Sequence, residues 1–234
     1  MMLVESFRMD KRQEASASVG EDISYLYDEL DKCRNFSQRL TVCDKLLSYI
    51  GSGSSRVVFG FNPYRNDIVL KLAKNQKGIA QNEEEGQFWK NDYSCFPKVI
   101  ETDTNSRWIV VERSTGKMTK NLFKQLTGVS FELFMQLVYT NAYNYSNNKY
   151  RSVIASCINQ ELKEKVKAYL EQVWDSGEPE FIADFLRFMD DAQVDWMFIS
   201  DLKAVRNWGI VNDHPVIVDS GMNENVFNQF YMKR

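Results

Sequence analysis

The chain has 234 residues and a formal net charge of −3, with 44% hydrophobic and 13% aromatic residues. This length suits one domain of moderate size or two small lobes with a packed core. The charge balance lacks the basic excess that a general nucleic-acid footprint requires, so no nucleic-acid partner is expected.

The cysteines and the N-terminus favour an intracellular protein. Cys33, Cys43, Cys95 and Cys157 form no Cys-x-x-Cys pair, and there is a single histidine, which disfavours a zinc site. We expect reduced, mostly buried thiols and a cytoplasmic location. The first residues lack the apolar core of a signal peptide. No window approaches the ~20 apolar residues of a membrane span, so no membrane partner is expected.

The first third of the chain predicts a helical extension followed by a small β-rich region. Residues 1–20 are polar and indicate a loose arm, and residues 23–50 have helical spacing with a break near 35–37. In 51–73, a glycine-serine turn, a β-branched run, an Asn-Pro turn and a second apolar run predict a β-hairpin. The acidic and amide-rich segment 78–91 predicts a helix.

The middle of the chain changes from strand to helix. The apolar run at 108–112 predicts a short buried strand, and the polar stretch 114–120 is typical of a connector between two regions. Ser130 is an expected N-cap of a helix. Residues 159–174 and 180–191 repeat apolar residues on one face and predict amphipathic helices.

A hairpin near the end of the chain places oxygen donors together. Residues 208–211 and 216–218 are apolar runs around an Asn-Asp-His-Pro turn. Paired residues of an antiparallel hairpin lie about 5 Å apart at Cα, so Asn207 and Asp219 should converge at its open end. Asp201, just upstream, could point toward the same place. Such a set suits Mg²⁺, although Asn and Asp also occur simply as turn residues.

Three further features suggest a phosphate site. Glycines in the stretch 51–55 let the backbone approach a phosphate, and the same residues also suit a plain flexible turn. Lys71 lies within an apolar strand, where it either faces outward or points into a cleft. One member of the cluster Glu83–Glu85 could pair with Lys71, while the others form a solvated helix face.

Taken in order, these features resemble the protein-kinase-like family. GSGSSRVVF is similar to its glycine-rich loop and IVLK to its lysine strand. IVVE resembles the strand before the connection between lobes, called the hinge. DLKAVRN resembles its catalytic loop, and VDSG its metal-binding motif. The resemblance covers about residues 50–221 in the family's order.

The resemblance implies catalytic roles for the matched residues. Asp201 would act as the base or orient the acceptor hydroxyl, and Lys203 would lie near the γ-phosphate. Lys71 would hold the α- and β-phosphates. Its helix partner would be Glu85, with Glu84 as the less favoured choice.

The resemblance also implies ATP and Mg²⁺ as cofactors. Val58 would lie over the adenine, and Val111 would line its pocket. Asn207 and Asp219 would be the metal ligands. The full set of expected ATP contacts is Gly51, Ser52, Gly53, Ser54, Val58, Lys71, Val111 and Glu112.

The sequence departs from the family pattern in several places. Arg56 replaces the third glycine of the loop, Ile199–Ser200 replace the His-Arg pair before the catalytic Asp, and Ser220 replaces Phe. Asn207 is one residue further from the catalytic Asp than usual. After Gly221 the sequence shows no peptide-docking segment, as in minimal kinase-like proteins of bacterial effectors and phages. In that case the site of action would be a host cytoplasm.

We therefore expect an α+β, two-lobed protein-kinase-like fold with a small β-rich N-lobe and a reduced helical C-lobe. The expected parts are a helical extension (1–49), an N-lobe (50–113) and a C-lobe (114–234). The extension either pads the N-lobe or binds a partner. The expected function is ATP- and Mg²⁺-dependent transfer of the γ-phosphate to a hydroxyl, with a protein Ser/Thr favoured. The alternatives are a small-molecule phosphotransferase, a pseudokinase serving as a nucleotide-binding interaction module, or coincidental motifs.

Overall fold

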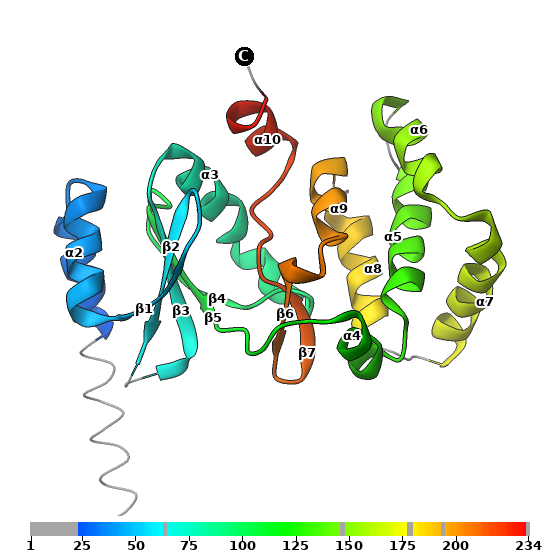
Figure 1. Cartoon of the computed structure of the whole chain (residues 1–234), viewed down its shortest axis with the longest axis horizontal. Coiled ribbons are helices and arrows are strands. Elements are labelled where there is room, and N and C mark those ends of the chain that lie inside the picture. The colour runs from blue at the N-terminus through cyan, green and yellow to red at the C-terminus, as the bar shows by residue number, and fades with distance from the viewer. Residues whose placement is uncertain (1–22, 63–64, 146–147, 177–179, 193–194, 233–234) are drawn as a thin grey trace, which may run out of the picture.

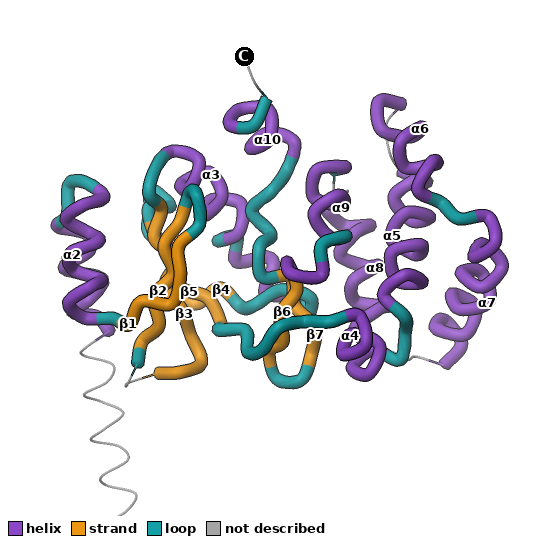
Figure 2. Tube along the Cα trace, viewed as in Figure 1, coloured by secondary structure: helices purple, strands orange, loops and turns teal. Residues whose placement is uncertain are grey.

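The computed structural model describes residues 23–62, 65–145, 148–176, 180–192 and 195–232. These residues form two lobes, one built on a sheet and one built of helices (Figure 1). A second, two-stranded sheet lies between the main sheet and the helices (Figure 2).

The elements follow one another in the order helix, strands, helix, strands, helices, hairpin, helix. The strands are β1 (Ser48–Ser52), β2 (Arg56–Phe61), β3 (Arg65–Ala73), β4 (Val99–Thr102), β5 (Trp108–Glu112), β6 (Trp208–Val211) and β7 (His214–Ile217). The α-helices are α2 (Phe36–Leu46), α3 (Gln76–Glu85), α4 (Lys120–Thr127), α5 (Phe131–Tyr145), α6 (Asn148–Cys157), α7 (Gln160–Ser176), α8 (Glu180–Ala192), α9 (Trp196–Leu202) and α10 (Glu224–Phe230). Two 3₁₀ turns are η1 (Phe88–Asp92) and η2 (Val205–Asn207).

The small-lobe sheet has two chemically different faces. Its strands are antiparallel, in the order β1-β2-β3-β5-β4. Phe59 is paired with Leu70, while the neighbouring Val58 is paired with Lys71. Because successive side chains point to opposite faces, the first pair faces an apolar cluster and the second pair faces the other lobe.

The N-terminal helices cover the apolar face. Residues 23–32 are helical, and α2 begins where the Asn35 side chain accepts from the backbone N–H of Gln38 (3.0 Å). Leu30 and Cys43 are fully buried in the same cluster as Phe59. Residues 23–46 therefore pad the small lobe, which is the first of the two roles expected for the extension.

The large lobe is organised around α5 and one indole ring. Helix α5 packs against α6, α7 and α8. Trp208, at the start of β6, is 2% exposed, and its Nε1 donates to the carbonyl of Leu202 (2.9 Å). Five rings surround it at centroid distances of 5.4–6.3 Å, namely Phe123, Phe131, Phe134, Phe181 and Phe185. This cluster fixes the start of the hairpin to the helices.

Most of the elements with strong periodicity are confirmed. The predicted β-hairpin is β2–β3, and the predicted strand 108–112 is β5. The helix after Ser130 is α5, and the Ser130 hydroxyl accepts from the N–H of Leu133 (3.2 Å) as an N-cap. Helices α7 and α8 match the two predicted amphipathic helices.

Other local predictions were wrong. The helical spacing does not continue to Ile50, because the chain is extended at Leu47 and enters β1. The helix predicted over 78–91 ends at Glu85 and is followed by η1. The turn of the second hairpin is only Asn212–Asp213, both with positive φ (49° and 63°), so His214 and Pro215 belong to β7. A type I′-like conformation of this kind suits Asn and Asp.

The expected α+β architecture is confirmed, with a small β-rich lobe and a helical lobe. The polar arm predicted over 1–20 lies outside the described residues. Within the described ranges, no helix combines the length and apolar character needed to cross a bilayer.

Candidate active site

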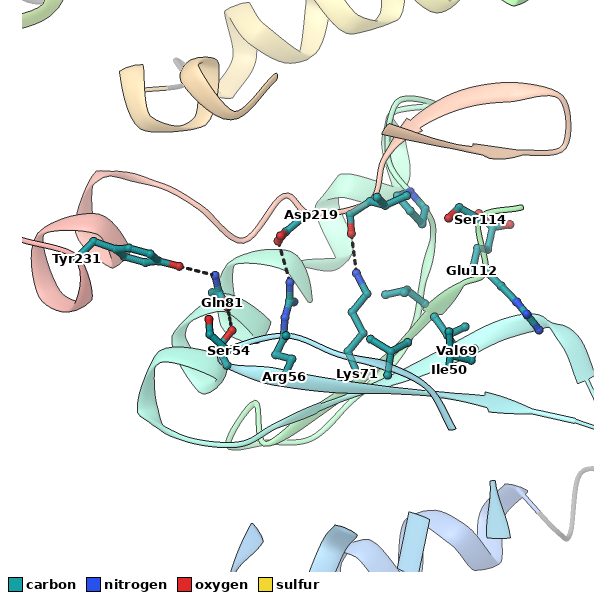
Figure 3. A pocket seen from close by; sticks show the side chains of 17 residues that line it. Ile50, Ser54, Arg56, Val69, Lys71, Gln81, Glu112, Ser114, Asp219 and Tyr231 are labelled. Carbon is teal, nitrogen blue, oxygen red and sulfur yellow. Dashed lines mark hydrogen bonds and ion pairs between the residues drawn. The ribbon is translucent and has the colours of Figure 1, made fainter. Parts of the chain in front are cut away.

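A cavity of about 490 Å³ lies between the small-lobe sheet and the segment that follows β7. The lining includes the apolar side chains of Val58, Val69 and Val111. In Figure 3, Val69 lies toward the Glu112 end, and the charged Lys71 and Asp219 lie in the middle. Apolar side chains next to fixed charges suit a ligand with a flat base and a phosphate chain.

Lys71 is the centre of the charged part. It lies on the cleft-facing side of β3 and is 8% exposed. Its ammonium forms an ion pair with Glu85 of α3 and donates to the carbonyl of Val218 (2.7 Å). The Glu85 side chain is buried, with 6% of its surface exposed. Burial raises its pKa, but Arg56 and Lys71 outweigh that effect and hold the pKa at about 2.

Arg56 completes this cluster and was not among the expected site residues. Its Nη1 donates to Glu85 Oε2 (2.5 Å), and its Nη2 donates to Asp219 Oδ1 (2.8 Å). The signal in the sequence was a charged residue at the start of a β-branched run, where the resembled family has a glycine. The spacing of the sequence could not show that its partner lies 163 residues away.

The loop that faces the cavity is 53–55, slightly later than expected. Gly51 and Ser52 belong to β1 and are not part of the cavity lining, whereas Gly53 and Ser54 are. Lys77 Nζ donates to Ser54 Oγ (3.0 Å), and Ser55 Oγ donates to Gln81 Oε1 (2.5 Å). Helix α3 therefore holds the loop from one side.

The hinge end of the cavity contains Val111, Glu112 and Ser114. The N–H of Glu112 already donates to the carbonyl of Lys98 (3.0 Å). The N–H of Arg113 donates to the carbonyl of Asp67 (2.7 Å). The backbone hydrogen bonds expected from the Glu112 region must therefore come from carbonyl oxygens or from Ser114 rather than from these two N–H groups.

The second hairpin brings the two expected metal ligands close together. The N–H of Val218 donates to the carbonyl of Asn207 (2.9 Å), so Asn207 lies opposite the residue before Asp219. Asn207 Nδ2 donates to the carbonyl of Asp201 (3.0 Å). The extra residue between Asp201 and Asn207 is taken up by two successive tight turns, 201–204 and 204–207.

Asp201 and Lys203 lie outside the cavity lining. Asp201 nevertheless interacts electrostatically with Asp219, which is a lining residue. Burial, and then the negative charge of Asp219, raise the pKa of Asp201 to about 6, against a smaller lowering by Arg206. Lys203 Nζ lies 3.7 Å from Cys157 Sγ and 4.9 Å from the centroid of the Trp196 ring. The structure thus places Lys203 among large-lobe side chains rather than beside Lys71.

The donors at the hairpin fit a magnesium ion. The side chain of Asp219 is 48% exposed and lines the cavity. The Nδ2 of Asn207 donates to the backbone carbonyl of Asp201, which leaves its Oδ1 as the atom that could bind a metal. Within the described ranges no cluster of three or more Asp, Glu, His or Cys has metal-site geometry. Mg²⁺ commonly takes one or two protein oxygens, with phosphates and water as the remaining ligands.

Tyr231 is a lining residue that the sequence did not suggest. Helix α10 contacts both α3 and α9, and Tyr231 follows it at the end of the cavity opposite the hinge (Figure 3). Gln81 Nε2 donates to its hydroxyl (3.5 Å), and Lys77 Nζ lies 4.2 Å from the centroid of its ring. The segment after the second hairpin therefore returns to the small lobe.

Two solved structures align with most of the chain at low identity. The streptomycin–ATP–APH(2'')-IIa ternary complex is 15% identical with a TM-score of 0.32, covering 79% of this chain and 69% of that one. The ADP-bound aminoglycoside phosphotransferase APH(2'')-Ib is 13% identical with a TM-score of 0.33, covering 78% and 69%. No protein-family model and no curated protein matches the sequence. The strand order of the small-lobe sheet and the buried Lys71–Glu85 pair agree with what the sequence resemblance implies.

Proposed function

We propose that the chain is an ATP- and Mg²⁺-dependent phosphotransferase that moves the γ-phosphate to a hydroxyl acceptor. The observation that carries this proposal is the position of Lys71. Its ammonium is tied to both Glu85 and the Val218 carbonyl, so that it stands beside Asp219 in a cavity of about 490 Å³. Phosphoryl transfer needs mainly positioning and charge stabilisation, and this cluster can supply both.

Each residue has a physical task in this proposal. Lys71 and the backbone of 53–55 bind the phosphates. Asp219 and Asn207 would hold Mg²⁺, which offsets negative charge on the phosphates when bound. Asp201 accepts the proton of the acceptor hydroxyl. Its raised pKa makes its carboxylate a better proton acceptor than an ordinary aspartate near neutral pH.

A small-molecule acceptor is favoured over an extended peptide. Helix α10 bridges α3 and α9 (Figure 1) and brings Tyr231 to the cavity. Tyr231 lines the same cavity as Asp219, and a compact acceptor needs less room beside these residues than an extended peptide. A protein Ser/Thr remains the second candidate acceptor. We propose action in the cytoplasm, without nucleic acid or membrane as partners.

The test is transfer of radiolabel from γ-labelled ATP with and without Mg²⁺. Label is expected on a hydroxyl compound from a panel of small molecules, or on protein for the second candidate. We expect Asp201→Ala to abolish turnover while leaving ATP binding largely intact. We expect Asp219→Ala to weaken Mg²⁺-dependent binding, with a rate loss of about 10²–10³. Nucleotide binding without transfer to any acceptor would support the pseudokinase alternative instead.

A further inference from the structure

Four charged side chains form one continuous chain across the cavity. Lys71 and Arg56 share the Glu85 carboxylate, one on each oxygen. Arg56 then extends from Glu85 to Asp219 through its second terminal nitrogen (2.8 Å). Two cations and two anions are balanced, so this array is neutral before any ligand enters.

The two ends of Arg56 are held very differently. The side chains of Arg56 and Glu85 are 10% and 6% exposed, whereas that of Asp219 is 48% exposed. Nη1 is therefore bound inside the protein, while Nη2 is bound to a carboxylate that water can reach. A guanidinium is a planar fork that can serve two acidic groups at once without reorienting. Asp219 can leave Nη2 while Glu85 keeps Nη1 in place.

Two cations compete for the Asp219 carboxylate, namely Arg56 and Mg²⁺. In the proposed function it ligates Mg²⁺, and a divalent ion attracts a carboxylate more strongly than a guanidinium does at the same distance. If Asp219 turns to the metal, Nη2 loses its partner at the point where a phosphate chain would lie. A buried donor without an acceptor is costly, and phosphate oxygens are good acceptors for arginine.

We propose, resting on the proposed function, that Arg56 is a second phosphate-binding cation. In the unliganded protein it stays paired with Asp219, and this pair opens when the nucleotide and metal bind. On binding, Asp219 exchanges Arg56 for Mg²⁺, and Arg56 Nη2 donates to the phosphate chain. Arg56 also supports nucleotide binding when divalent ions are removed, because its charge stays in the site. A glycine at this position would provide neither effect.

The experiment measures ATP affinity by titration calorimetry, once with Mg²⁺ and once with EDTA, on the full chain. Arg56→Met is expected to weaken ATP binding about tenfold or more in EDTA, the size of a lost charge-assisted hydrogen bond. Arg56→Lys should keep the bond to Glu85 and give an intermediate loss, which covers the case in which Arg56→Met folds poorly. Arg34→Met is the matched control, because Arg34 is exposed and lies outside the cavity lining, and it should bind ATP like the original chain.

Asp219→Asn should change ATP affinity in opposite directions in the two buffers. It should weaken ATP binding in Mg²⁺ and strengthen it in EDTA, since Nη2 is released without the metal. In the double variant Arg56→Met/Asp219→Asn, the gain in EDTA should disappear. A gain that persists in the double variant would come only from removing a repelling carboxylate, and it would overturn the proposal.

Different results would overturn the role of Arg56 and the proposed phosphotransferase function. If the original chain binds ATP and transfers phosphate while Arg56→Met binds ATP equally well in both buffers, only the role of Arg56 is overturned. If the original chain binds no ATP in either buffer, the proposed function and the role of Arg56 both fall. Weaker binding of ATP but unchanged binding of adenosine by Arg56→Met would support contact with the phosphates.

Discussion

Lys71 of β3 and Glu85 of α3 form a buried ion pair, and the backbone carbonyl of Val218 accepts a second bond from the same lysine. One ammonium therefore joins the sheet, the helix and the segment after the second hairpin. Glu85 is 14 positions from Lys71 in the chain, whereas Val218 is 147 positions away. The point where they meet fixes where a phosphate could bind. Substitutions here should affect stability and ligand binding together.

Replacing Glu85 with Gln should strongly destabilise the protein. Two buried cations, Arg56 and Lys71, would lose their shared counter-ion, and breaking a buried pair in this way costs about 3–5 kcal/mol. Because Glu85 ionises with a pKa near 2 in the folded protein, its stabilisation is present above about pH 4 and fades as the pH falls toward 2. The deficit of Glu85→Gln in urea unfolding should therefore shrink in acid.

The control for this measurement is Glu83→Gln, which changes an exposed carboxylate on the same helix. Its effect should stay within about 0.5 kcal/mol, as is usual for surface substitutions. Equal stability of the two variants at pH 7 would show that Glu85 is not the counter-ion described above.

Asp201 should give a pH dependence of opposite sign. Its folded pKa is raised to about 6, above the ordinary value of about 4, so ionisation costs stability as the pH rises between these values. Asp201→Asn removes that cost, and its melting temperature should exceed that of the original chain at pH 8 but not at pH 4. Differential scanning calorimetry at both pH values measures this. A constant difference between the two would contradict the raised pKa.

The same ionisation should limit turnover in acid. The carboxylate form of Asp201 is needed to accept a proton, so the rate should fall about tenfold per pH unit below pH 6. The check is a pH profile of kcat at saturating ATP, with nucleotide binding measured in parallel. A flat profile down to pH 5 would exclude Asp201 as the proton acceptor.

Gly209→Ala should disturb the contact between the hairpin and the hinge. A Cβ at this position would lie 2.5 Å from Ser114 Cβ and 2.6 Å from Val218 Cγ1, distances at which one of the two segments must shift. Overpacking of this kind costs about 1–3 kcal/mol. Because Val218 precedes Asp219, Mg²⁺-dependent ATP binding should weaken as well. Gly51→Ala is the control, since nothing lies within 4 Å of its added Cβ, and equal unfolding free energies would refute the expectation.

Trp208→Phe should weaken the large lobe. The substitution removes the donor to the Leu202 carbonyl and leaves part of the ring pocket empty. An unsatisfied buried acceptor costs about 1–3 kcal/mol, which circular dichroism in urea can resolve. Trp89→Phe changes a ring that is 44% exposed and should have a smaller effect. The opposite ranking would mean that Trp208 does not organise the core.

The sequence predicted those parts of the fold that depend on local periodicity. The run at 108–112 and the strand around Lys71 are continuous apolar stretches with β-branched residues, and they became β5 and β3. Ser130 and the apolar spacing after it specified α5. The converging ends of the hairpin, Asn207 and Asp219, followed from antiparallel pairing alone.

The remaining features depend on contacts that periodicity does not encode. Helix α9 has seven residues, too few for a clear apolar stripe, and its N-cap Asp195 is not distinctive among so many acids. The bond from Arg56 to Asp219 joins residues 163 positions apart. The return of Tyr231 to Gln81 spans 150. Lys203 was assigned by analogy, and its contacts with Cys157 and Trp196 come from large-lobe packing.

Two backbone hydrogen bonds, one on either side of Ser114, limit how the two lobes can move relative to each other. The N–H of Arg113 is bonded to Asp67 in the small lobe, and the N–H of Thr115 is bonded to Ile210 in β6 (2.7 and 2.8 Å). Rotation between the lobes is therefore confined to Ser114, the one residue between these two bonds. Ser114 also lies where a side chain at position 209 would project. Any change in the gap between the two lobes would therefore have to come from the backbone torsions of this single residue.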